Sequence, residues 1–208
     1  MNILNLLEKY PELDYLNIKN KEEFFNNFTF HTFNKGSILK GYECPGLIFV
    51  LDGTIDIYTI NYDGKESYLY SLHQGDYCHK SIYCHIKNKE LDIIGYCIEE
   101  TNVAILPNGL IKEFLLSTPY FLSCIYQDSY LKLINMIQEK NDILTLSIED
   151  RIIKYLKNSN SNVIYITHSQ LASYINTSRE VVSRNLKKLE KKGIIKIGIG
   201  KITLLGKL

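Results

Sequence analysis

Apolar positions between residues 167 and 189 repeat with the period of two short helices. The segment reads THSQLASYINTSREVVSRNLKKL. The apolar residues are Leu171, Ala172 and Ile175 in the first helix, and Val181, Val182, Leu186 and Leu189 in the second. These spacings place each set on one side of its helix, so the two stripes can bury against each other. The pattern predicts a helix-turn-helix.

The residues around these helices fit the same arrangement. Asn176 tolerates the left-handed conformation that a tight interhelical turn needs, and Thr177 or Ser178 can cap the amides that open the second helix. Gly193 can end that helix. The following IIKIGIGKITLL alternates around two glycines, which predicts a β-hairpin wing.

The second helix also carries an outward row of polar residues. Its members are Ser178, Arg179, Glu180, Ser183 and Arg184. Arginine can bind guanine through two donors, glutamate can accept from cytosine, and serine can do either. The row is therefore predicted to read base edges in a major groove. An ordinary solvated helix face, with Glu180 and Arg184 one turn apart as an ion pair, is the alternative.

Charge is divided unevenly along the chain. Residues 146–208 hold 12 Lys and Arg against 4 Asp and Glu, whereas residues 1–145 hold 12 against 19. A basic C-terminal region gains affinity for the phosphate backbone through counterion release. Lys187 and Lys188 beside the second helix and Lys201 on the wing are expected to contact phosphate, although an exposed hairpin lysine can also serve only to prevent aggregation.

Composition sets the broad class. The chain has 208 residues, 45% hydrophobic and 23% charged, as in a soluble protein of two modest domains. No run approaches the roughly 20 apolar residues of a membrane span, and the first residues lack a secretory pattern. We therefore expect a cytoplasmic protein without membrane contact. Five cysteines, an odd number, indicate reduced thiols rather than a disulfide framework.

The front of the chain has the pattern of a β protein. Short β-branched and aromatic segments, separated by turn residues, occupy residues 31–40, 46–60, 65–77 and 91–106. This spacing predicts a small antiparallel barrel or roll. Asp52-Gly53 and Asp63-Gly64 are the strongest hairpin signals.

Residues 111–146 change to a helical pattern, and Pro119 can open a long helix. A heptad-like set comprises Tyr126, Tyr130, Leu133, Ile137 and Leu144, and a second apolar set comprises Phe121, Ile125, Leu131 and Ile134. One face can cover the roll while the heptad face pairs with a second subunit. A single wide core face within a monomer is the alternative.

This order of parts resembles the cyclic-AMP receptor protein and FNR (Crp/Fnr) family of bacterial transcription regulators. The resemblance is most specific in TSREVVSRNLKKLEKKGII and extends to IEDRIIKYLK, to the GTIDIY segment and to LHQGDY. It implies an α+β fold. The expected parts are a double-stranded jelly-roll sensor domain over residues 1–118, a dimerisation helix over 119–145, and a winged helix-turn-helix over 146–208.

The resemblance also implies roles for individual residues. Residues matching Arg179, Glu180 and Arg184 read base edges in the family, and the arrangement of Glu180, Ser183 and Arg184 fits its FNR branch. The residues expected at phosphate are Thr167, His168, Ser169, Thr177, Lys187, Lys188 and Lys201. A homodimer on a near-palindromic operator is implied, with half-sites about one helical turn apart. RNA polymerase is an expected partner.

The same comparison argues against cyclic AMP as the effector. The family's ribose-binding Gly-Glu pair falls at His79-Lys80, and its phosphate-binding Arg falls at Leu91, beside Asp92. A leucine with a neighbouring carboxylate would repel the cyclic phosphate instead of binding it. The purine-contacting polar pair falls at Met136-Ile137. We therefore expect a signal other than cyclic AMP. It would act allosterically, by changing the spacing of the two DNA-binding domains across the dimer.

Cysteine and histidine cluster where a signal could bind. Cys78, His79, Cys84 and His85 lie close in sequence, and Cys97 could lie near them. These side chains bind haem, iron-sulfur clusters or zinc, and a thiol can also react directly. The spacing matches no standard zinc pattern, no cysteine precedes Cys44, and buried cysteine is often only a small hydrophobe. Haem, a metal, a reactive thiol and no cofactor remain open.

Two other function classes fit the sequence less well. An enzyme needs a nucleophile with its base, paired carboxylates or a phosphate-binding glycine loop, and none occurs with supportive spacing. A ligand-binding module without DNA function would leave Arg179, Glu180 and Arg184 unexplained. The sequence is therefore interpreted as a DNA-binding regulator and not as an enzyme.

Overall fold

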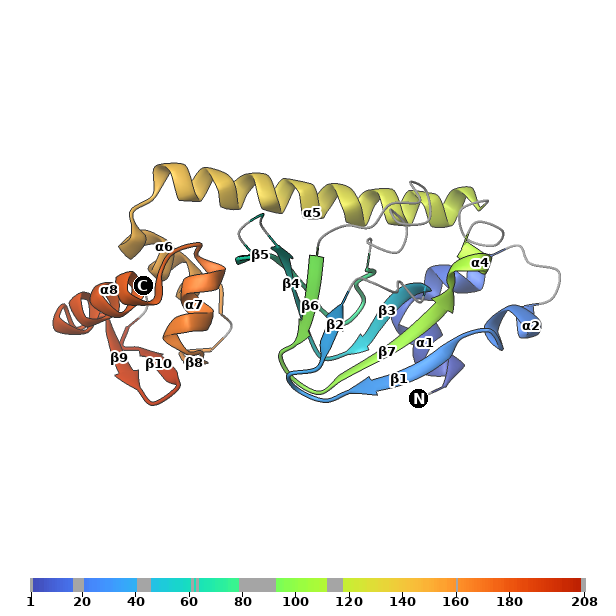
Figure 1. The fold of residues 1–208 in the computed structure, drawn as a ribbon, viewed down its shortest axis with the longest axis horizontal. Coiled ribbons are helices and arrows are strands. Elements are labelled where there is room, and N and C mark those ends of the chain that lie inside the picture. Colours follow the sequence, from blue (N-terminus) through green and yellow to red (C-terminus); the bar gives the residue numbers. More distant parts are fainter. Residues whose placement is uncertain are drawn as a thin grey trace. The chain divides into compact units, whose positions relative to one another are not determined.

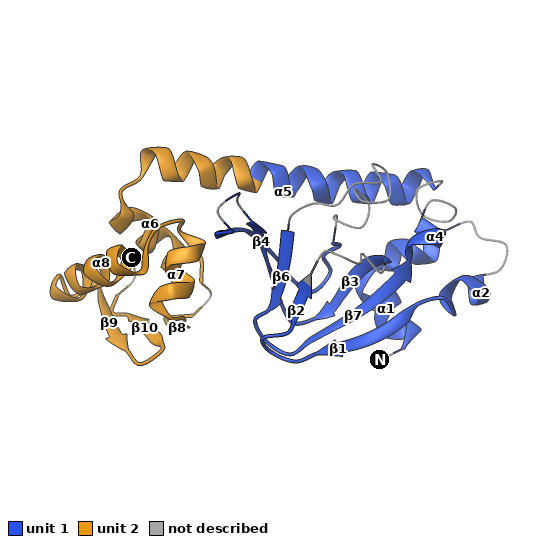
Figure 2. Ribbon diagram, in the orientation of Figure 1, with its two compact units in different colours: residues 1–134 blue, residues 135–208 orange. Residues whose placement is uncertain are grey.

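The computed structural model describes residues 2–16, 21–40, 46–60, 62, 64–78, 93–111, 118–159 and 161–206 (Figure 1). The chain divides into two compact units, residues 1–134 and 135–208 (Figure 2). The division falls within the long helix α5, Pro119–Thr145. Each unit is described by itself.

The N-terminal unit contains two antiparallel sheets. One has the order β1 (Thr29–Phe33), β7 (Thr101–Pro107) and β3 (Gly46–Asp52). The other has the order β2 (Ile38–Lys40), β6 (Ile93–Cys97), β4 (Ile55–Ile60) and β5 (Glu66–Leu72). The predicted β-roll is confirmed.

Strand β3 lies at the end of the order β1-β7-β3, yet it is buried on both faces. Its residues Ile48 and Val50 pack in the core between the two sheets, with Ile55 and Ile57 from β4. On the opposite face, its alternate residues meet the helical segments α1 (Ile3–Lys9), the 3-10 helix Pro11–Tyr15, α2 (Lys21–Phe25) and α5. Burial of both faces explains why GLIFVL is continuously apolar rather than alternating.

The Asp52-Gly53 turn does not form the predicted hairpin. It joins β3 to β4, and these strands belong to different sheets. Gly53 has φ 84°, and a Cβ there would lie 2.5 Å from the Glu100 carbonyl oxygen. The glycine therefore allows a tight turn between sheets, and the doubly buried β3 pairs with β7 instead.

The second hairpin signal is confirmed by strand pairing. Strands β4 and β5 are antiparallel neighbours, and Gly64 between them has φ 71°. Asp63 itself lies outside the described residues. A short α4 (Asn108–Leu110) follows β7.

Helix α5 begins at Pro119, as predicted, and its first turns cover the roll. Phe121 and Ile125 are buried in the core of the N-terminal unit. The heptad set is exposed in the single chain; the exposed fractions are 70% for Tyr126, 52% for Tyr130, 52% for Leu133, 54% for Ile137 and 75% for Leu144. Leu131 was expected on the covered face, but it is 63% exposed.

An ionic cluster fastens α5 to the turn that follows β5. The Lys132 ammonium lies 2.7 Å from Asp128 and 3.1 Å from Asp76. The backbone amide of His73 donates to Asp76 at 2.7 Å. Burial opposes ionisation of Asp76, but the hydrogen bonds from His73 and the Lys132 charge prevail and lower its pKa to about 2. The hydrogen bond with Asp76 in turn raises the pKa of His73.

After the end of α5, the described residues of the C-terminal unit form three helices and a small sheet. Its helices are α6 (Ile148–Lys157), α7 (His168–Tyr174) and α8 (Arg179–Lys191). Its strands are β8 (Val163–Tyr165), β9 (Ile195–Gly198) and β10 (Lys201–Leu204), in the order β8-β10-β9. The predicted wing is the β9–β10 hairpin. The predicted apolar stripes meet in one core, although Val181 is only half-buried.

Candidate nucleic-acid interface

Local interactions between residues near in sequence define both ends of α7. The Thr167 hydroxyl accepts from the Gln170 amide at 3.1 Å and donates to the Gln170 side chain at 2.9 Å, while that side chain accepts from the Thr167 amide at 3.0 Å. This capping box defines where α7 begins. Asn176 follows the helix with φ 52°, the left-handed conformation predicted for the turn.

Ser178 begins the second helix of the motif. Its side chain accepts from the Val181 amide at 3.4 Å, so Ser178 rather than Thr177 is the cap of α8. At the far end Gly193 has φ 70°, and the Ile194 amide donates to Leu189 at 3.1 Å. These bonds end α8 in a Schellman motif, as the glycine predicted.

The outward face of α8 is polar and accessible. Its exposed members are Ser178, Arg179, Glu180, Arg184, Lys187 and Lys188. The pKa of Glu180 is lowered, first by a hydrogen bond with its own backbone and then by the Ser178 hydroxyl and the charges of Arg179 and Arg184. The Glu180 carboxylate is therefore ionised near neutral pH and offers only acceptors, which suits the exocyclic amine of cytosine.

Ser183 differs from the rest of this row because it is half-buried. Its hydroxyl lies 2.8 Å from Nδ1 of His168, the first residue of α7. The bond joins the two helices of the motif, and the apolar spacing gave no signal for it.

A cleft of about 350 Å³ opens beside this bond. It is lined by Ile166, Thr167, His168, Ser169, Arg179, Gly198 and Gly200. The lining therefore combines the start of α7, the first residue of α8 and the turn of the wing. Imidazole, hydroxyl and guanidinium groups are all donors that a phosphate accepts from. Lys201, the predicted wing contact, is exposed next to this turn.

Three further residues hold this arrangement in place and were missed by the sequence analysis. Arg151 of α6 donates to the Ile175 carbonyl oxygen at 2.8 Å, at the turn between α7 and α8. Glu190 at the end of α8 accepts from the Ile197 amide of β9 at 2.7 Å. Lys192 pairs with Glu149 of α6. Each contact joins a helix to the end of another helix or to a strand, which the periodicity within one element does not reveal.

The sequence of this unit matches a known domain family. Residues 143–206 fit the family described as Crp-like helix-turn-helix domain. This region is a Crp-like helix-turn-helix domain. No curated protein matches the chain.

Solved structures extend the likeness beyond the Crp-like domain. A transcriptional regulator of the Crp/Fnr family from Eubacterium rectale is 23% identical, with a TM-score of 0.80 over 96% of this chain and 95% of its own. The c-di-GMP-responsive global regulator CLP from Xanthomonas campestris is 18% identical, with a TM-score of 0.78 over 89% and 98%. FixK2 from Bradyrhizobium japonicum is 16% identical, with a TM-score of 0.67 over 86% and 93%. The chain therefore has the Crp/Fnr fold from its β-roll to its Crp-like domain.

The cysteines and histidines suggested as a sensor are only partly described. Cys78 and Cys97 are buried in the core between the two sheets of the roll, and burial raises the pKa of the Cys97 thiol. His79, Cys84 and His85 lie outside the described residues, as do Lys80, Leu91 and Asp92. Within the described ranges, His, Cys, Asp and Glu form no group of three or more that could hold a metal ion.

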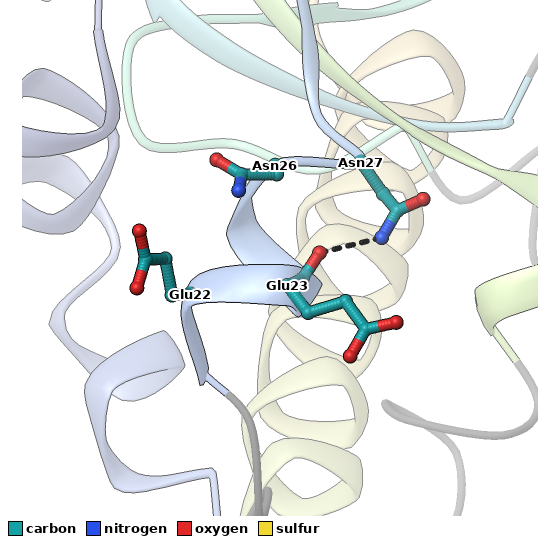
Figure 3. A pocket seen from close by; sticks show the side chains of 4 residues that line it. All are labelled: Glu22, Glu23, Asn26 and Asn27. Atoms are coloured by element: carbon teal, nitrogen blue, oxygen red, sulfur yellow. Dashed lines mark hydrogen bonds between the residues drawn. The ribbon is translucent and has the colours of Figure 1, made fainter.

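A second hollow, of about 380 Å³, lies beside the short helix α2. It is lined by Glu22, Glu23, Asn26 and Asn27 (Figure 3). The Asn27 side chain donates to the Glu23 carbonyl oxygen at 2.7 Å, which closes the end of the helix. The Asn27 amide at this hollow thus serves the local backbone. Within the described parts of the chain, no helix has the length and apolarity of a membrane span.

Proposed function

We propose that this protein is a sequence-specific transcription regulator that binds a near-palindromic operator as a homodimer. The observation that carries the proposal is the exposed row on α8, with Arg179, Glu180 and Arg184 accessible beside a cleft of phosphate-binding groups. Caps and a buried core hold α8 at both ends, so the row is presented on a rigid element. This combination suits base readout flanked by backbone contacts.

The exposed heptad face of α5 supports the dimer. Five apolar side chains on this face are each at least 52% exposed in the single chain, and Tyr126 and Tyr130 stack with ring centroids 6.1 Å apart. A second copy of α5 would bury them in coiled-coil fashion. Two heads on one dimer would then meet two half-sites about one helical turn apart.

The controlling signal is proposed to be something other than cyclic AMP. Met136 and Ile137, at the positions that would face a purine, are apolar and stand exposed on α5 by 38% and 54%. The alternative signal is a haem, metal or thiol chemistry using the segment from Cys78 to His85. Anaerobic purification followed by an absorption spectrum and iron and zinc analysis tests the haem and metal options. A Soret band or stoichiometric metal favours the segment from Cys78 to His85, and a colourless metal-free protein favours a thiol, another small molecule or no effector.

The DNA-binding function is tested by selection from genomic fragments with the purified full-length protein. Wild type should enrich a near-palindromic motif, and the variant Arg179→Ala/Glu180→Ala/Arg184→Ala should lose it. Lys192→Gln is the matched control, because Lys192 is paired with Glu149 away from the row. A triple variant that enriches the same fragments as wild type would show that this row does not read bases. A wild type that enriches no motif would instead favour a ligand-binding module without DNA function. RNA polymerase is the proposed downstream partner, assayed by transcription from an enriched fragment.

A further inference from the structure

The bond between His168 and Ser183 connects two different parts of the candidate interface. Ser183 lies one turn after Arg179 on α8, within the row proposed to face bases, whereas His168 lines the cleft proposed to hold phosphate. The donor and acceptor atoms are 2.8 Å apart and partly shielded from solvent. The position of the hydrogen on the His168 ring therefore determines whether Ser183 can donate a hydrogen bond to a base.

The constraint follows from the number of hydrogens. A hydroxyl has one hydrogen and two lone pairs, and a neutral imidazole has one N–H and one bare nitrogen. If Nδ1 of His168 carries the hydrogen, the ring donates to Ser183, and the hydroxyl hydrogen stays available to DNA. If Nδ1 is bare, Ser183 must donate to the ring. Ser183 can then only accept from DNA.

The cleft decides between these two states. Nδ1 is occupied by Ser183, so Nε2 is the ring nitrogen that remains for a ligand of the cleft. A phosphate oxygen is an acceptor and requires a hydrogen on Nε2. Arg179 lines the same cleft and supplies positive charge for the phosphate, so His168 need donate only the hydrogen on Nε2 there. A neutral ring with its hydrogen on Nε2 leaves Nδ1 bare.

We propose that His168 is a specificity-determining residue that acts through Ser183. In this state the Ser183 hydroxyl donates its single hydrogen to Nδ1 of His168. The hydroxyl oxygen can then act only as an acceptor toward bases in the major groove. Adenine N6 and cytosine N4 are the base donors in that groove, whereas guanine and thymine present acceptors at the corresponding atoms. Ser183 therefore selects adenine or cytosine over guanine or thymine at one strand position of each half-site. This inference rests on the proposed DNA-binding function.

The test compares base preferences among full-length variants in one selection from randomised DNA at fixed salt. Wild type should prefer adenine or cytosine at one position per half-site by about fivefold, the worth of one neutral hydrogen bond of about 1 kcal/mol. His168→Leu should reduce this preference below about twofold and leave the other positions unchanged. His168→Leu/Ser183→Ala should match Ser183→Ala, because the histidine acts through the hydroxyl. Ser169→Ala, from the same cleft, should weaken binding to all sequences alike.

Two results would overturn the inference. If His168→Leu loses affinity uniformly, like Ser169→Ala, and keeps the wild-type preference for adenine or cytosine, His168 is a phosphate contact only. The second readout needs no variant: nitrogen-15 NMR of the histidine ring in the DNA complex should show a neutral ring with hydrogen on Nε2, and hydrogen on Nδ1 contradicts the mechanism. If wild type enriches no motif, the proposed function itself fails, which is distinct from a motif without the predicted position.

Discussion

The salt dependence of DNA binding gives a quantitative test of the interface through Lys188. This lysine is exposed on α8 one turn after Arg184 and is a candidate phosphate contact. Each phosphate that a protein neutralises adds about 0.9 to the slope of log affinity against log salt. Lys188→Gln removes one such contact from each head, so a dimer should lose about 1.8 from its slope. A monomer would lose about 0.9.

These slopes translate into an easily measured difference. Between 50 and 200 mM salt, a slope difference of about 1.8 means that wild type loses about tenfold more affinity than Lys188→Gln. Fluorescence anisotropy of full-length protein on a labelled operator duplex, titrated at five or six potassium chloride concentrations, resolves this.

The control for this experiment is Lys192→Gln. It makes the same change in net charge, but Lys192 pairs with Glu149 of α6. Its slope should change by less than about 0.5, because the Lys192 charge is already paired with a carboxylate and releases fewer counterions on binding. Equal slope changes in the two variants would show that only net charge matters, and an unchanged slope in Lys188→Gln would remove Lys188 from the interface.

Four further outcomes are expected. Arg184→Ala should cost about 1 to 3 kcal/mol of affinity on the cognate operator but little on scrambled DNA, measured by competition binding; equal losses would refute base reading. Leu186→Ala should lower the unfolding free energy of the C-terminal unit by about 2 to 5 kcal/mol in urea titrations, since Leu186 is fully buried. Ile137→Asp should dissociate the dimer in sedimentation, whereas Gln138→Asp, on the neighbouring solvent-facing position, should not. The pKa of Asp76, lowered to about 2, means stability that is present above about pH 4 and lost as pH falls to about 2; Asp76→Asn should lack this loss of about 2 kcal/mol in acid unfolding curves.

The sequence predicted best those features that depend on neighbours in the chain. The stripes of α7 and α8, the left-handed Asn176 and the stop at Gly193 all follow from local periodicity and backbone conformation. Pro119 marked the start of α5 for the same reason, because its missing donor costs nothing there.

Features that depend on distant partners were missed or misassigned. Strand β8 has only three residues, and it exists because it pairs with β10. Asp52-Gly53 is a residue pair typical of hairpin turns, but β3 is buried on both faces and pairs with β7 rather than with β4. Leu131 was assigned to the covered face with Phe121, yet ten residues correspond to a rotation about 80° away from it in a helix of 3.6 residues per turn. The roll-facing row continues instead through Asp128 and Lys132.

Helix α8 has a buried apolar side and an exposed polar side, and this separation affects how binding preference can change in evolution. Val182, Leu186 and Leu189 hold the helix in the core, and Glu190 fixes the wing strand, whereas Arg179 and Arg184 project outward. Exchanges at the two exposed arginines should therefore cost little folding stability. On the proposed function, such exchanges change the recognised sequence, so new operators can be explored one substitution at a time. Ser183 is the exception, because its bond to His168 makes the two positions change together. Descendants of this protein should vary them as a pair.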